Sequence, residues 1–232
     1  MSWSLTPDEF AHVWRRADLD RIPYPLRVLE SPRTERDARL LRAELAQRFP
    51  PDPDLDACLR ILALPQTRVI AIGGAPEPGR ELRVLGCVVY DRAVLAVQAP
   101  GRTREFGGPV QLSIGHSTKL GARLAALLPK APAGRHPART ASAAAVRDTE
   151  TVIQEVRAAP LIRKLLCAPH TADGHIRIEP HLDRPNPPPP LHYTWLDVEN
   201  DGRYLLKADE NVHMVPTSPE QLAAHLQKRI PG

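Results

Sequence analysis

The sequence predicts an α+β fold, in which helical bundles flank a central antiparallel sheet. Three observations support this prediction. Apolar residues recur every three or four positions before Pro65, as in amphipathic helices. Short β-branched segments joined by turns follow between Arg68 and Ile114, as in antiparallel strands. The second half of the chain then repeats this order of helices and strands. Separate runs of helices and strands are typical of α+β architecture.

The first helix has a clear start. Thr6 can cap it, Pro7 suits the first helical position, and Glu9 completes a capping box. Apolar residues then fall on one face of the helix, which predicts that this face is buried. The other elements expected before Pro65 are a short strand at 26–29 and helices at 34–49 and 53–64.

A hairpin is the strongest strand signal in the first half. Residues 82–90 and 93–99 are rich in β-branched and apolar residues, and the turn Asp91-Arg92 separates them. The Gly/Pro-rich loop 73–80 (GGAPEPGR) precedes the hairpin and is expected to protrude between strands. The remaining elements of this half are strands at 68–72 and 110–114 and a helix from Ser117 to Leu128.

A Pro/Ala/Arg-rich segment without periodicity, 130–140, is expected to link two parts of the chain. We therefore predict an N-terminal half at 1–129, a linker at 130–145 and a C-terminal half at 146–232, which together form one domain. The second half is expected to contain helices at 142–157 and 160–167, strands at 175–178, 191–198, 203–207 and 212–215, a polyproline loop at 184–190, and a last helix capped by Ser218.

The two halves resemble each other. Helix, strand, loop, hairpin, strand and helix follow in this order in both. At an offset of 102 residues, Val110 corresponds to Val212 and Leu120 corresponds to Leu222. This correspondence predicts a pseudo-twofold internal repeat, with both halves contributing strands to one sheet.

Composition narrows the range of functions. No apolar run approaches the roughly 18 residues of a membrane span, and the N-terminus lacks the basic start and apolar stretch of a secretory signal. We therefore expect a soluble, cytoplasmic protein without a membrane partner. The three cysteines, Cys58, Cys87 and Cys167, are odd in number and scattered, which argues against disulfides and against a zinc site.

Nucleic-acid binding is one alternative function, because the formal net charge is +4. The distribution of charge argues against it. Basic residues are interleaved with acidic ones, as in Glu35-Arg36-Asp37, and aromatic residues make up only 4%, too few for a base-stacking platform. We therefore expect no nucleic-acid partner.

A metal-dependent enzyme using the segment His170 to Asp183 is a second alternative. His170, His175 and His181, with Asp173 and Asp183, could be drawn as a metal site, but their spacing fits no zinc signature. The sequence contains no nucleotide-binding, serine-hydrolase or zinc-protease motif. We therefore expect no catalytic residue, metal or cofactor. Asp197 and Glu199 alternate along a strand, and we place this pair on the solvent side of a hairpin.

Seven segments carry a family resemblance: Ile22 to Val28 (IPYPLRV), Arg33 to Arg36 (RTER), Asp54 to Leu62 with Pro65, the hairpin Leu82 to Val97, Gly202 to Leu205 (GRYL), Val215-Pro216, and Leu222 with Leu226. In this order they resemble the EspG family, the cytosolic chaperones of type VII (ESX) secretion systems in actinobacteria. The segments are spread in order along nearly the whole chain, and none of them is catalytic.

The resemblance implies a central antiparallel sheet, helical bundles and a pseudo-twofold axis. It also implies a function: a chaperone that binds the exposed hydrophobic tip of a helical PE/PPE-like or WXG100-like secretion substrate, keeps it soluble and targets it for export. Such a partner would meet a loop of the sheet and the C-terminal helical bundle. Whether the chaperone itself is a monomer or a homodimer stays open.

The family's contact residues do not map one by one onto this sequence, so the candidate site rests on physical arguments. The loop 73–80 protrudes between strands. The helix 160–167 combines an apolar ridge with a basic rim, which suits an amphipathic helix of a partner. Leu165 and Leu166 are expected in the core instead. The candidate partner-binding residues are Pro76, Glu77, Pro78 and Arg80 in the loop, and Leu161, Ile162, Arg163 and Lys164 in the helix.

Overall fold

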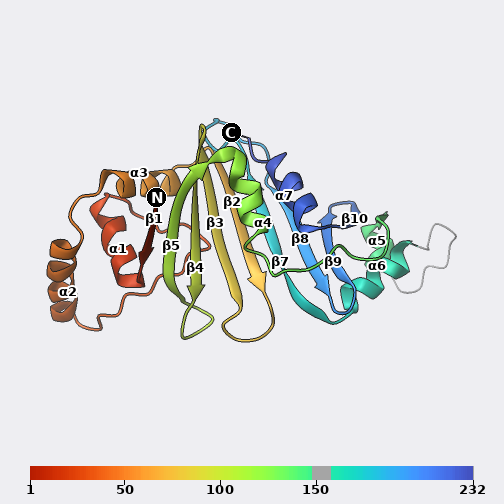
Figure 1. The fold of residues 1–232 in the computed structure, drawn as a ribbon, viewed down its shortest axis with the longest axis horizontal. Helices are drawn as coiled ribbons and strands as arrows, with labels where there is room; N and C mark the ends of the chain where they lie inside the picture. Colours follow the sequence, from red (N-terminus) through yellow and green to blue (C-terminus); the bar gives the residue numbers. More distant parts are fainter. Residues whose placement is uncertain (148–157, 232) are drawn as a thin grey trace.

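One ten-stranded sheet runs through the molecule (Figure 1). The computed structural model describes residues 1–147 and 158–231. The α+β fold and the central antiparallel sheet are confirmed. The strands are β1 (Ser2–Leu5), β2 (Thr67–Gly74), β3 (Glu81–Val89), β4 (Arg92–Pro100), β5 (Gly107–His116), β6 (Arg139–Ser142), β7 (His170–Glu179), β8 (Leu191–Val198), β9 (Gly202–Ala208) and β10 (Asn211–Pro216).

The strand order is β1-β5-β4-β3-β2-β7-β8-β9-β10-β6, and every neighbouring pair is antiparallel. The predicted hairpin of 82–99 forms β3 and β4. The two halves of the chain meet at the centre of the sheet, where β2 pairs with β7 from Arg68↔Glu179 to Gly74↔Asp173. The loop β2–β3 and the start of β7 therefore lie at the same end of the sheet.

The described part of the chain contains seven α-helices and one short 3-10 helix, and all but α2 lie close to the sheet, whereas α2 packs against α1. The helices are α1 (Pro7–Arg16), α2 (Glu35–Arg48), α3 (Pro53–Ala63), η1 (Ser117–Lys119), α4 (Leu120–Ala125), α5 (Ala143–Arg147), α6 (Ala158–Cys167) and α7 (Pro219–Gln227). The capping boxes predicted at Thr6–Glu9 and Ser218–Gln221 both form at the starts of α1 and α7.

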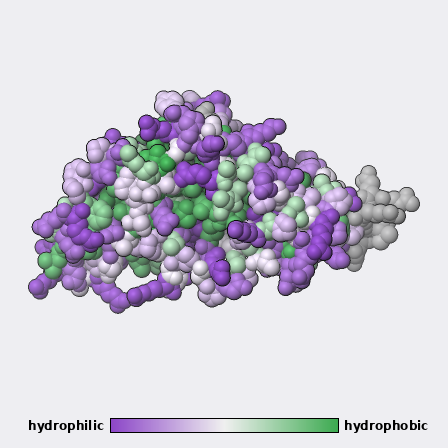
Figure 2. Space-filling model, in the orientation of Figure 1, coloured by the Kyte–Doolittle hydropathy of each residue, from purple (hydrophilic) through white to green (hydrophobic). Residues whose placement is uncertain are grey.

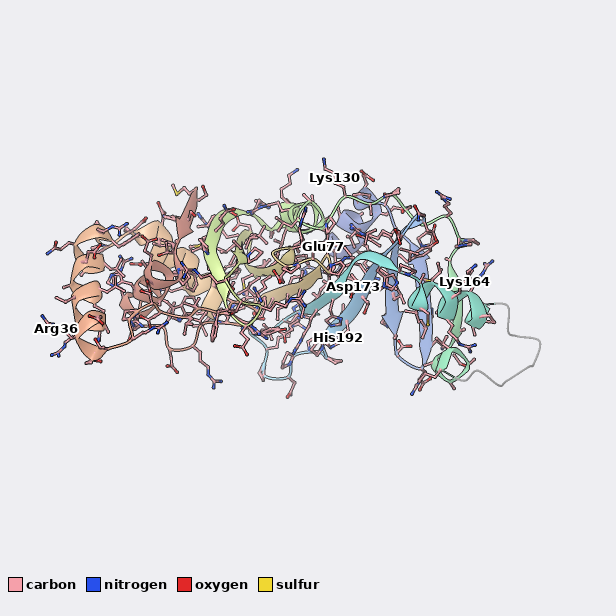
Figure 3. All side chains as sticks on the ribbon, turned by 90° about the horizontal axis from the view of Figure 1, so that it is seen from below. Arg36, Glu77, Lys130, Lys164, Asp173 and His192 are labelled. Carbon is pink, nitrogen blue, oxygen red and sulfur yellow. The ribbon has the colours of Figure 1, made fainter. Side chains whose placement is uncertain are left out.

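The helices cover the two faces of the sheet differently. On one face, α4 and α7 pack over the central strands. Figure 2 shows the molecule from this side, where apolar areas lie among hydrophilic ones. On the opposite face, α1 and α3 pack over β3, β4 and β5 at one end. The helices α5 and α6 pack over β8, β9 and β10 at the other end. The middle of this second face lies between the two helical groups (Figure 3).

A glycine allows α4 and α7 to approach each other closely. A Cβ built on Gly121 would meet the carbonyl oxygen of Ala223 at 2.6 Å and the amide nitrogen of Gln227 at 2.8 Å. The Gly121 N–H instead donates to Oε1 of Gln227 at 2.9 Å, and Nε2 of Gln227 donates to the Ser117 carbonyl at 3.2 Å. This contact joins the last helix of each half of the chain.

The prediction of a strand at 26–29 is wrong, because this segment forms no strand in the structure. The buried side chain of Gln98 takes the place of a strand partner. Its Oε1 accepts from the Arg27 N–H at 2.8 Å, and its Nε2 donates to the Arg27 carbonyl at 3.1 Å. A side chain thus satisfies backbone groups that a sheet ladder would otherwise pair.

Two short edge strands were not predicted. The first, β1, pairs with β5 and precedes α1. The second, β6, lies within the segment 130–145 that we expected to be a linker, and it pairs with β10. The preceding stretch is also fixed, because the Arg203 N–H donates to the Pro132 carbonyl at 2.7 Å and the Gly134 N–H donates to the Arg203 carbonyl at 3.0 Å. Backbone pairing with β9 and β10 therefore orders a segment that lacks periodicity.

Two further elements differ in length from their predictions. The strand predicted at 175–178 begins earlier, because β7 spans His170–Glu179 with an irregularity between His170 and Ala172. The helix predicted at 142–157 begins as α5 at Ala143, and its residues from 148 lie outside the described residues. No helix among the described residues is long and apolar enough to cross a membrane.

Candidate partner-binding surface

The loop between β2 and β3 carries four of the predicted binding residues. Pro76, Glu77, Pro78 and Arg80 are all exposed. The loop closes on itself, because the Arg80 N–H donates to the Glu77 carbonyl at 3.3 Å and the Gly79 N–H donates to Oε2 of Glu81 at 3.2 Å. Its start is tight, since Gly73 and Gly74 have φ angles of +145° and +123° that favour glycine.

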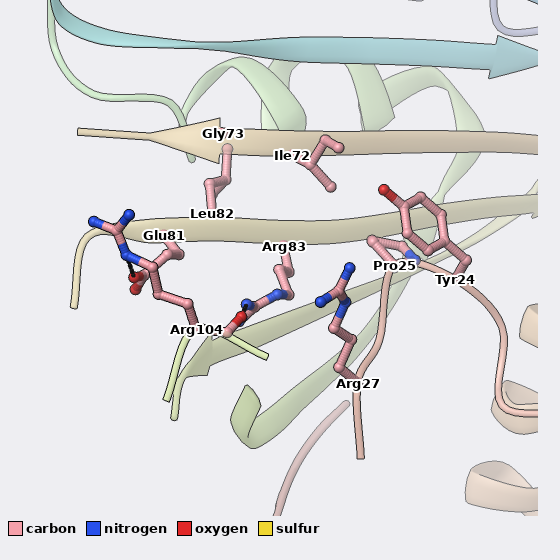
Figure 4. Close-up of a pocket in the computed structure, with 9 residues that line it drawn as sticks. All are labelled: Tyr24, Pro25, Arg27, Ile72, Gly73, Glu81, Leu82, Arg83 and Arg104. Carbon is pink, nitrogen blue, oxygen red and sulfur yellow. Dashed lines mark hydrogen bonds and ion pairs between the residues drawn. The ribbon is translucent and has the colours of Figure 1, made fainter. Parts of the chain in front are cut away.

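Arg104, which the sequence did not single out, braces this loop from the neighbouring loop β4–β5. Its Nη2 donates to the Pro76 carbonyl at 2.9 Å, and its Nε lies 3.4 Å from Oε1 of Glu81. Figure 4 shows this ion pair beside the pocket that the two loops border. The brace makes one surface feature out of two loops that are far apart in sequence.

The pocket in Figure 4 has a volume of about 210 Å³ and lies at the foot of the loop β2–β3. Its apolar part includes Ile72, Leu82 and the exposed ring of Tyr24. Its polar part contains three guanidinium groups and one carboxylate. These are Arg27, Arg83, Arg104 and Glu81.

The guanidinium groups of this pocket are partly held by backbone carbonyls. Arg83 donates through Nη2 to the Arg104 carbonyl, and Arg27 donates through Nη1 to the Glu105 carbonyl at 3.3 Å. Nη1 of Arg83 is shielded from solvent and has no hydrogen-bond partner among the described residues. The pocket therefore offers an apolar floor with an excess of positive charge, which suits an acceptor group flanked by apolar atoms.

The helix α6 presents fewer of its predicted binding residues than expected. Ile162 is fully buried in the core beneath the helix, so it is not part of the surface, and Leu161 is partly buried. Arg163 donates through Nε and Nη2 to the carbonyls of Val146 and Ala145, at the end of α5. Lys164 is exposed. Leu165 is in the core as expected, whereas Leu166 is 37% exposed.

The two predicted parts of the site lie at the same end of the sheet. Gly74 at the base of the loop pairs with Asp173 of β7, and β7 follows α6 directly. In the view of Figure 3, Asp173 lies between Glu77 of the loop and Lys164 of α6. The loop and α6 therefore lie toward the same edge of the sheet, with the start of β7 between them.

The histidines considered for a metal site do not converge. His170 contacts the Leu165 carbonyl through Nε2 at 3.0 Å, and His175 instead contacts His192 at 3.0 Å. His181 lies beyond the other end of β7. Among residues 1–147 and 158–231 there is no group of three or more His, Cys, Asp or Glu side chains that could hold a metal ion.

The two buried cysteines are poor nucleophiles. Burial raises the pKa of Cys58 to about 12, and burial also raises the pKa of Cys87 to about 12. Both thiols pack in the core beneath α1 and α3. The thiolate is the reactive form of cysteine, so these residues have a structural role.

The comparison with protein families shows which family the chain belongs to. The model of the EspG family matches residues 6–228, which is nearly the whole chain. The chain belongs to the EspG family. No curated protein sequence matches it. EspG proteins form a non-catalytic family of ESX secretion-associated chaperones. The match includes both the loop β2–β3 and α6, so the candidate surface lies within the EspG region of the chain.

Proposed function

We propose that this EspG-family protein binds the hydrophobic tip of a helical PE/PPE-type secretion substrate, keeps it soluble in the cytoplasm and presents it to an ESX system. The observation that supports the proposal best is the match to the EspG family over residues 6–228. The partner would contact the surface formed by the loop β2–β3, the pocket at its foot and the exposed side of α6.

The chemistry of this surface suits an amphipathic helical partner. Two exposed prolines in the loop are conformationally restricted, so less entropy is lost when the loop is held in a complex. Ile72, Leu82 and Tyr24 provide apolar contacts beside the loop. The guanidinium groups around them can bind carboxylates or carbonyl groups at the rim of a buried apolar contact. Lys164 extends the basic rim toward the second part of the surface.

Co-expression tests this proposal directly. A PE/PPE pair encoded beside this gene is expected to remain soluble only with the chaperone and to elute with it in size-exclusion chromatography. Charge reversal in the loop, Arg80→Glu, is expected to weaken the complex by about tenfold or more, as for a central interface residue. Arg104→Ala is expected to weaken it less, because the Arg104 guanidinium is already held by the Pro76 carbonyl and Glu81, so its loss mainly removes the brace of the loop.

Arg92→Glu provides the matched control. Arg92 is also an exposed arginine beside a hairpin loop, but it begins β4, at the opposite end of β3 from the loop β2–β3. The Arg92→Glu variant should therefore bind the PE/PPE pair with unchanged affinity. Equal losses from Arg80→Glu and Arg92→Glu would place the interface elsewhere, and the absence of any complex with the wild-type chain would overturn the substrate assignment.

We also infer that the chain is one domain built from two related halves, 1–129 and 146–232. The strand order supports this inference, because β2, β3, β4, β5 and β1 lead outward from the centre as β7, β8, β9, β10 and β6 do on the other side. A helix follows β5 and another follows β10, and these two helices, α4 and α7, pack together.

A truncated chain of residues 1–129 tests the one-domain arrangement. It would expose the edge of β2 and the apolar side of α4, so it is expected to aggregate or to unfold without cooperativity. Circular dichroism and size-exclusion chromatography would report this. If each half gave a cooperative, monomeric folding transition alone, the chain would instead consist of two domains.

A further inference from the structure

A second pocket lies on the other face of the sheet, beside α7. Its volume is about 410 Å³, within the roughly 300–1,000 Å³ of small-molecule sites. Leu205 of β9 and Val215 of β10, which pair across the strands, form part of its apolar floor, and Tyr193 of β8 adds an aromatic wall. Lys207, His213, His225 and Arg229 bring polar groups to the same cavity.

An arginine of α4 occupies the corresponding place in the first half of the chain. There, Arg123 of α4 hydrogen-bonds through Nη2 to Oγ of Ser113 in β5, and its guanidinium lies over Gly115. Residues 102 positions later are His225 in α7 and Val215 in β10. A shorter side chain thus replaces the arginine, and an apolar residue replaces its hydrogen-bond partner. If the two halves correspond as proposed, these two differences leave more room beside α7 than Arg123 leaves beside α4.

His225 and Arg229 bring side-chain nitrogen atoms to the wall of the cavity. Nε2 of His225 is shielded from solvent and has no hydrogen-bond partner among the described residues. Burial lowers the pKa of His225 to about 4, and the charges of Arg229 and Lys228 add to this shift, so the ring is neutral at pH 7. Tyr193 holds both residues: its ring meets that of His225 edge-on at 4.9 Å, and the Arg229 guanidinium lies 5.6 Å above it.

The charge of the cavity selects the class of ligand. Its described lining contains two permanent cations, Lys207 and Arg229, and no carboxylate. Arg229 uses Nη1 to bind the His225 carbonyl at 3.1 Å, and a guanidinium has five donors, so others can bind an anion. Lys207 is paired with Asp209 at 3.0 Å, but this ion pair is about half exposed and therefore weak.

We propose that this cavity is a binding site for a small organic carboxylate with a compact apolar body, of about the size of benzoate. The carboxylate would bind Arg229 and Lys207, and the apolar body would pack on Leu205 and Val215. Guanidinium–carboxylate pairing supplies the preference for an acid over a neutral molecule of the same shape. The site lies on the face that carries α7, so it does not depend on the proposed chaperone surface.

A titration of ¹⁵N-labelled protein with benzoate, followed by NMR, tests this proposal. Benzyl alcohol, which has nearly the same shape and no charge, is the comparison ligand. Benzoate is expected to shift amides of α7, β9 and β10 with a Kd of about 1 mM or lower, and at least tenfold tighter than benzyl alcohol. Equal affinities would show an apolar cavity only and would overturn the proposal, as would no benzoate binding at about 20 mM.

Three variants locate the site. His225→Arg introduces the residue that α4 has at the equivalent position, Arg123. The longer side chain is expected to fill the cavity and to reduce the affinity for benzoate at least tenfold. Arg229→Gln is expected to remove most of the preference for benzoate over benzyl alcohol. Val215→Glu changes a residue that is 46% exposed, so it should fold normally. It should weaken benzoate binding more than benzyl alcohol binding, because both ligands lose an apolar contact but only benzoate is also repelled. Benzoate affinity unchanged in Arg229→Gln and Val215→Glu would overturn the assignment.

Discussion

Replacing Asp197 with alanine is expected to lower the free energy of unfolding by about 3–5 kcal/mol. Asp197 and Arg203 form a bidentate ion pair across β8 and β9, with Nε–Oδ1 and Nη2–Oδ2 distances of 2.6 Å. Both side chains are shielded from solvent, at 2% and 0% exposure. Without the carboxylate, the Arg203 guanidinium would remain buried, and the Pro129 carbonyl would be its only hydrogen-bond partner among the residues that the structure describes. An uncompensated buried charge costs far more than an exposed ion pair contributes.

Urea unfolding followed by circular dichroism measures this loss, and a double variant controls for its cause. In the other half of the sheet, the second pair from the β3–β4 turn is Val88↔Ala93, an apolar pair in the position that Asp197↔Arg203 occupies near the β8–β9 turn. Asp197→Val with Arg203→Met is therefore expected to recover at least half of the loss. If the double variant were less stable than Asp197→Ala, the buried charge would not be the source of the effect.

The ion pair also shows what the sequence could and could not predict. We expected Asp197 and Glu199 to share the solvent side of a hairpin. The hairpin is confirmed, but Asp197 is buried against Arg203 and Glu199 is exposed in the turn. The sequence did contain the signal for this ion pair. Once the position of a tight turn is known, the residues that face each other across the two strands follow from it. A carboxylate facing an arginine in that register predicts a buried pair as well as a surface one.

Elements defined by local chemistry were predicted well. The capping boxes of α1 and α7 and the β3–β4 hairpin depend on residues close in sequence, and all three are confirmed. The edge strands β1 and β6 have only four residues each, and their pairing depends on β5 and β10. Their own sequences carry little periodic signal, so only tertiary structure defines them.

On the candidate surface, too, features set by nearby residues could be predicted, and features set by tertiary contacts could not. The loop β2–β3 was predicted from its glycines and prolines, and its four named residues are exposed. Ile162 and Leu161 looked alike in sequence, but the helix turns Ile162 fully into the core. Arg104 could not be predicted, because it lies in a loop without periodicity and its partners, Pro76 and Glu81, are more than twenty residues away. Such a contact exists only when two hairpins lie side by side.

Gly174→Val is expected to destabilise the protein by about 2–3 kcal/mol through overpacking. A Cβ built on Gly174 would meet Cη2 of Trp195 at 2.0 Å and the Ile72 carbonyl oxygen at 2.4 Å. The Trp195 ring is fully buried, and it lies over Gly174 and also near its cross-strand partner Gly73. Strand propensity favours valine over glycine, but only by about 1 kcal/mol, so the steric clash should outweigh it.

A double-mutant cycle with Trp195→Leu separates the clash from other effects. Removing the indole opens space above the strand, so valine at position 174 should cost less in the Trp195→Leu background than in the wild type. Urea unfolding of the four proteins gives the coupling energy, expected at about 1 kcal/mol or more in the favourable direction. Additive losses would mean that the ring does not press on this strand. A large coupling would instead show that β7 carries glycine here to admit Trp195 beneath α4 and α7, at the base of the loop proposed to bind the partner.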